Sequence, residues 1–74
     1  MTKKELQILI GKNIRRIRLE KKISAQELAS RCNFEKSAMS RLEAGNTNPT
    51  VYTLYKISQA LDIKIEEIMQ KGDL

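Results

Sequence analysis

The side chains best suited to chemistry are basic and hydroxyl groups on one face of a short segment, residues 36–44. Met39 and Leu42 have helical spacing and set the inward side of this segment. The same phase turns four polar side chains outward: Lys36, Ser37, Ser40 and Arg41. An arginine fork can donate two hydrogen bonds to guanine O6 and N7, and lysine can do so less rigidly. This face therefore predicts contact with a nucleic acid.

The distribution of charge also favours a polyanionic partner. The chain has 74 residues, a formal net charge of +5 and room for one domain, residues 1–74. Eleven of its 14 Lys and Arg residues lie in residues 1–45, and the rest of the chain is nearly neutral. One face of the domain would then bind a polyanion, while another face would serve for packing. A basic surface that only confers solubility is the alternative.

The composition disfavours catalysis and metal binding. There is no histidine, and the single cysteine, Cys32, can form neither an internal disulfide nor a metal site. No phosphate-binding glycine loop and no nucleophile with a nearby base can be recognised. The longest apolar run, 8–10, is too short for a membrane span. We therefore expect that the protein is not an enzyme and that it binds no metal, cofactor, membrane or small-molecule ligand. We also expect a reducing, cytoplasmic setting.

Apolar periodicity and capping residues predict an all-α fold of five helices. The expected helices lie at about 3–22, 25–32, 36–44, 50–61 and 64–70. The first helix carries an apolar stripe of Leu6, Ile10, Ile14 and Ile17. Ser24 and Glu27 are spaced as a capping box, Gly45 ends the third helix, and Thr50 caps the fourth.

Residues 25–44 have the features of two short helices that cross at a steep angle. Ala29 supplies a small side chain where the backbones approach, and Asn33 tolerates a left-handed turn. Apolar residues would lock the second helix against the first: Leu28, Met39 and Leu42, with Cys32 and Phe34. These features predict a helix-turn-helix, whose second helix enters the major groove of DNA.

Four motifs carry a resemblance over roughly residues 10–70: IRRIR (14–18), SAQELA (24–29), MSRLEAG (39–45) and NPT (48–50). In these the chain resembles the Cro and phage-repressor family, of the xenobiotic-response-element type. The resemblance implies a compact, lambda-repressor-like bundle of five helices. It also implies that a homodimer binds a pseudo-palindromic operator, in a bacterial or phage-encoded regulator.

The resemblance further implies roles for particular residues. Lys36, Ser37 and Arg41 would read base edges. Arg18 would pair with Glu43 and would also contact a phosphate. Residues expected at phosphates are Gln26, Ser40, Asn46, Thr47, Asn48 and Thr50. The last helix would supply the dimer contact through Ile63, Ile65, Ile68 and Met69.

Two positions depart from the family pattern. The glutamine that commonly begins the second helix is replaced by Ala25, with Gln26 one position later, which weakens the phosphate role of Gln26. Glu35 stands where a Ser, Thr or Asp cap is usual. Its carboxylate suits a helix N-terminus but repels phosphate.

Several functions remain compatible with the sequence. A protein–protein adaptor of the same fold is one alternative, although it has no need of Lys36 and Arg41 on an outward face. Within DNA binding, a phage-type repressor, an antitoxin and a restriction–modification controller would share these features. RNA binding is disfavoured because stacking modules use more exposed aromatic residues than this chain has.

Overall fold

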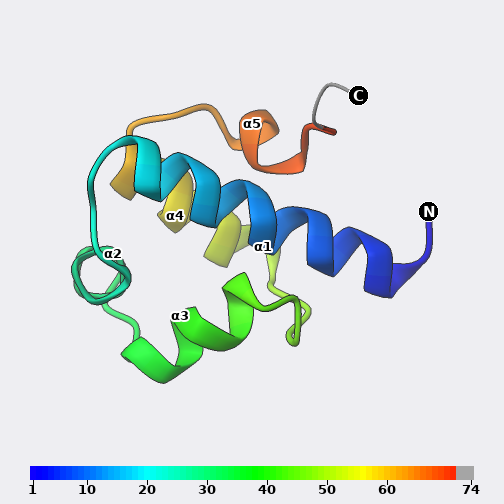
Figure 1. The fold of residues 1–74 in the computed structure, drawn as a ribbon, viewed down its shortest axis with the longest axis horizontal. Coiled ribbons are helices and arrows are strands. Elements are labelled where there is room, and N and C mark those ends of the chain that lie inside the picture. The colour runs from blue at the N-terminus through cyan, green and yellow to red at the C-terminus, as the bar shows by residue number, and fades with distance from the viewer. Residues whose placement is uncertain (72–74) are drawn as a thin grey trace.

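The fold consists of five helices, and the later four are arranged around the first (Figure 1). A computed structural model describes residues 1–71. The helices are α1 (Lys3–Glu20), α2 (Ala25–Arg31), α3 (Lys36–Glu43), α4 (Val51–Leu61) and α5 (Ile65–Met69), and residues 1–71 contain no strand. Helix α1 packs against α3 on one side and α5 on the other. The predicted all-α, five-helix architecture is confirmed.

The core is formed by the apolar stripes of all five helices. Ile10, Ile14 and Ile17 of α1 are buried as predicted, whereas Leu6 is only partly buried at the edge. The other helices contribute Leu28, Ala29, Met39, Leu42, Leu54, Ile57, Leu61 and Ile68. Buried Asn13 also donates from Nδ2 to the carbonyls of Ile68 and Gln70, at 2.7 Å each, and so ties α5 to α1. No helix within residues 1–71 is long and apolar enough to cross a membrane.

Left-handed residues follow the ends of four helices and turn the chain sharply. Asn33 (φ 60°) and Gly45 (φ 76°) have this conformation, as the sequence predicted. Lys22 (φ 59°) and Asp62 (φ 56°) share it, which the sequence did not indicate. Helix α1 consequently ends at Glu20, before the predicted residue 22. The turn lets Ile23, the residue after Lys22, fold back into the core. Such an apolar contact commonly accompanies a helix end with a left-handed residue.

The helix N-termini are capped unequally. Thr2, Ser24 and Thr50 each accept a hydrogen bond from a backbone N–H of the first turn, as expected for Ser24 and Thr50. The predicted capping box at Ser24 is only half formed, because Glu27 pairs with Arg31 at 2.6 Å instead. Glu35, at the start of α3, makes no side-chain capping bond.

Candidate nucleic-acid interface

The corner between α2 and α3 is built as a helix-turn-helix. Helix α2 packs on α3, and Ala29 of α2 is 2% exposed. The N–H of Phe34 donates to the Ala29 carbonyl at 2.8 Å, which closes the turn around left-handed Asn33. Met39 is fully buried and packs the inner face of α3 into the core. The corner therefore orients α3 with one face in the core and the other in solvent.

The solvent face of α3 holds the polar side chains that the helical phase predicted. All four are exposed: Lys36, Ser37, Ser40 and Arg41. None of them makes a side-chain hydrogen bond or ion pair with residues 1–71. Their donors are consequently available to an external acceptor. Gln26, near the start of α2, is exposed as well.

The C-terminal end of α3 is joined to α1 by the ion pair expected between Arg18 and Glu43. Arg18 Nε and Nη2 contact the two Glu43 carboxylate oxygens at 2.7 and 2.9 Å, and both side chains are 8% exposed. The hydrogen bond to Glu43 raises the pKa of Arg18 above its ordinary value. Arg18 Nη1 also donates to the Ile23 carbonyl at 3.0 Å. Buried and bonded in this way, Arg18 cannot reach a phosphate, so that expectation was wrong.

The segment between α3 and α4 borders the same surface. Asn46, Asn48 and Thr50 are exposed, and Thr47 is partly buried. The Thr50 hydroxyl accepts from the Thr53 N–H at 3.1 Å and donates to the Thr53 hydroxyl at 3.1 Å. This hydroxyl already has two partners, so of these residues it is the least free to bind another group.

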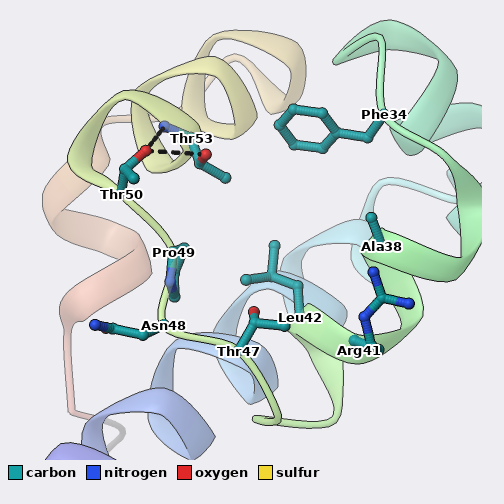
Figure 2. A pocket seen from close by; sticks show the side chains of 9 residues that line it. All are labelled: Phe34, Ala38, Arg41, Leu42, Thr47, Asn48, Pro49, Thr50 and Thr53. Atoms are coloured by element: carbon teal, nitrogen blue, oxygen red, sulfur yellow. Dashed lines mark hydrogen bonds between the residues drawn. The ribbon is translucent and has the colours of Figure 1, made fainter.

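A shallow pocket of about 260 Å³ separates α3 from the start of α4 (Figure 2). Phe34, Ala38 and Leu42 line its apolar side, and Thr50 and Thr53 lie across from them. Arg41 stands at the rim. The first turn of α4 thus faces α3 across a hollow.

Two features next to this surface escaped the sequence reasoning. Lys4 Nζ donates to the Gly45 carbonyl at 2.7 Å and to Asn46 Oδ1 at 3.1 Å. The rings of Tyr52 and Tyr55 stack on the exposed side of α4, with their centroids 6.4 Å apart. The tyrosine spacing of three residues carried a signal, because it places both on one helix face. No local pattern links Lys4 to a turn 41 residues away.

The apolar surface available for the predicted dimer contact is smaller than expected. Ile68 is fully buried in the core, so its side chain cannot contact a second copy. Ile63 and Ile65 are partly buried against the same core. Met69, 40% exposed, is the most accessible apolar side chain of the predicted set.

Comparisons with known proteins agree with this geometry. The profile of a helix-turn-helix family, HTH_3, matches residues 14–68. The chain is 38% identical over 69 residues to an uncharacterized HTH-type transcriptional regulator, y4dJ, of Sinorhizobium fredii, covering 93% of this chain and 90% of the relative. It is 37% identical over 62 residues to multiprotein-bridging factor 1 of Candida glabrata, covering 84% of this chain but only 41% of that protein.

A solved structure extends the likeness to three dimensions. The restriction-modification controller protein C.AhdI of Aeromonas hydrophila matches with a TM-score of 0.81 and 27% identity, over 84% of this chain and 94% of that chain. The chain therefore belongs to the helix-turn-helix family of DNA-binding transcriptional regulators. This membership confirms the Cro and phage-repressor resemblance.

Proposed function

We propose that this protein binds a pseudo-palindromic operator in double-stranded DNA as a homodimer in the cytoplasm, with α3 in the major groove. The observation that carries the proposal is the outward face of α3, where Lys36, Ser37 and Arg41 are exposed and have no partners within residues 1–71. Arg41 is the strongest candidate for reading guanine, because its fork matches the O6 and N7 acceptors. Lys36 and Ser37 would read neighbouring base edges.

The remaining predicted contacts position the protein on the duplex. Donors for phosphates are offered by Gln26, Ser40, Asn46, Thr47 and Asn48, whereas the Thr50 hydroxyl already donates to Thr53. One small domain reads few bases, so two copies would bind half-sites about 10 base pairs apart. Met69 and the exposed edge of Ile65 on α5, with that of Ile63 just before it, are the surface that remains for the dimer contact.

The proposal is tested by selecting bound sequences from random duplex DNA and titrating the enriched duplex. The Arg41→Ala variant should weaken selected-site binding by about 1–3 kcal/mol and leave binding to a scrambled duplex much less affected. Arg15→Ala removes the same charge from the exposed side of α1 and serves as the control. Equal losses on both duplexes would show that Arg41 does not read bases.

A second candidate, a protein–protein adaptor, is favoured by the similarity to multiprotein-bridging factor 1 and by exposed Val51, Tyr52 and Tyr55 on α4. An adaptor does not depend on the outward face of α3. A Lys36→Ala/Arg41→Ala variant that retains its biological activity would favour the adaptor.

The similarity to C.AhdI over most of that chain favours control of a restriction–modification system among the possible regulatory roles. An antitoxin and a phage-type repressor are the others. Mapping the selected operator to its neighbouring genes distinguishes the three.

A further inference from the structure

A lysine on the first turn of α1 contacts the turn that follows α3. Lys4 Nζ lies 2.7 Å from the Gly45 carbonyl oxygen and 3.1 Å from Asn46 Oδ1. Building on the proposed DNA binding, we propose that Lys4 is a positioning residue, which orients the Asn46 amide so that its NH2 group faces a phosphate of the DNA backbone.

The turn at Gly45 is pressed against α1, which gives Lys4 a fixed target. A Cβ atom on Gly45 would lie 2.9 Å from the Ile8 Cα atom. The Gly45 N–H donates to the Leu42 carbonyl at 3.1 Å, and the Asn46 N–H donates to the Arg41 carbonyl at 2.9 Å. These two bonds fix the backbone of the turn. The Asn46 side chain is then the part that still needs orienting.

The chemistry of the contact determines which end of the amide points outward. An asparagine amide has one acceptor oxygen and two N–H donors, whereas a lysine ammonium can only donate. Lys4 therefore engages Oδ1, and the NH2 group remains for an external partner. A phosphate oxygen is an acceptor only and matches that group. Asn46 is exposed, so a phosphate can approach it.

The neighbouring lysine provides a matched control. Lys3 and Lys4 are both exposed and carry the same charge, but Lys3 makes no side-chain hydrogen bond within residues 1–71. Titration of the selected duplex should show that Lys4→Met weakens binding about three- to tenfold more than Lys3→Met. Lys4→Arg keeps a donor and should recover most of the loss. Equal losses in Lys3→Met and Lys4→Met would overturn the proposal.

A double-mutant cycle separates positioning from direct contact. If Lys4 acts through Asn46, Lys4→Met should cause no further loss of affinity in the Asn46→Ala background. If Lys4 itself contacts a phosphate, the two losses multiply, and the salt dependence of binding falls by about one counterion relative to Lys3→Met. That second result would overturn the proposal.

Nuclear magnetic resonance of the free protein tests the contact without DNA. Lys4→Met should shift the side-chain NH2 signals of Asn46, identified with Asn46→Ala, and leave those of Asn48 unchanged, while Lys3→Met shifts neither. Unshifted Asn46 signals would refute the contact. A wild-type protein that shows the contact but binds no duplex would instead refute DNA binding, and with it the role assigned to Asn46.

Discussion

The two ends of α3 are held very differently. At the C-terminal end, Glu43 pairs with buried Arg18, and Lys4 contacts the turn at Gly45. Gly11 of α1 also lies so close that a Cβ atom there would be 2.5 Å from the Glu43 carbonyl oxygen. At the N-terminal end, Glu35 makes no side-chain capping bond, and Lys36 is exposed. The C-terminal end is thus held by side-chain bonds and close packing with α1, whereas the N-terminal end is held by the corner with α2 and has no side-chain cap.

The difference assigns separate tasks to the two ends. Contacts with α1 fix the last turn of α3 and the backbone that follows, and the corner with α2 orients its start. Lys36 and Ser37, on the first turn, are free to adjust their side chains to base edges. Substitutions at the anchored end should therefore change stability most, and substitutions at the free end should change it least.

The largest expected effect is that of Arg18→Met. It leaves the Glu43 carboxylate buried without a partner and should lower the free energy of unfolding by about 3–5 kcal/mol. Urea unfolding followed by circular dichroism measures this change. Arg16→Met breaks an exposed pair with Glu20 at 3.3 Å and should cost less than about 1 kcal/mol. Similar losses in both variants would mean that the buried pair does not anchor α3.

The next effect is that of Gly11→Ala, for which two principles predict opposite signs. Helix propensity alone predicts a gain of about 1 kcal/mol for alanine over glycine. The added methyl group would lie 2.5 and 2.6 Å from the Glu43 and Leu42 carbonyl oxygens, so we expect a loss of about 1–3 kcal/mol. Thermal unfolding decides the sign, with exposed Lys12→Ala as the control. A stabilised Gly11→Ala variant would show that α1 and α3 can separate at little cost.

The smallest effect is expected at the free end, where Glu35→Ser supplies the missing cap. A serine hydroxyl there can accept from the first-turn backbone and should stabilise the protein by about 1 kcal/mol. Glu35→Ala removes the same charge but adds no acceptor, so it separates capping from electrostatics. The melting temperature should rise for Glu35→Ser only. Equal melting temperatures for the two variants would mean that this end gains nothing from a cap.

Local chemistry explains which parts of this arrangement could be predicted. Asn33 and Gly45 are residue types that tolerate left-handed backbone, so the turns around α3 were recognisable. Lys22 adopts the same conformation without that signal, because burial of Ile23 decides it. The pairing of Arg18 with Glu43 followed from the family resemblance, although the residues themselves are far apart in the chain.

Contacts that depend on how the helices pack together could not be predicted from the sequence. A glycine inside a long helix is a recognisable anomaly, but only the structure shows that Gly11 accommodates α3. The short apolar pattern of α5 did not reveal which isoleucine faces inward, so Ile68 was assigned to the wrong surface. Lys4 reaches its partners only because α1 passes the end of α3.

Cys32, at the C-terminal end of α2, gives the folded protein a built-in reporter of its own opening. It is the chain's single thiol, it is 1% exposed, and burial raises its pKa. An alkylating reagent can therefore react quickly only in molecules in which the fold has opened around Cys32. The rate of its modification would measure how often this part of the protein opens, without any added label.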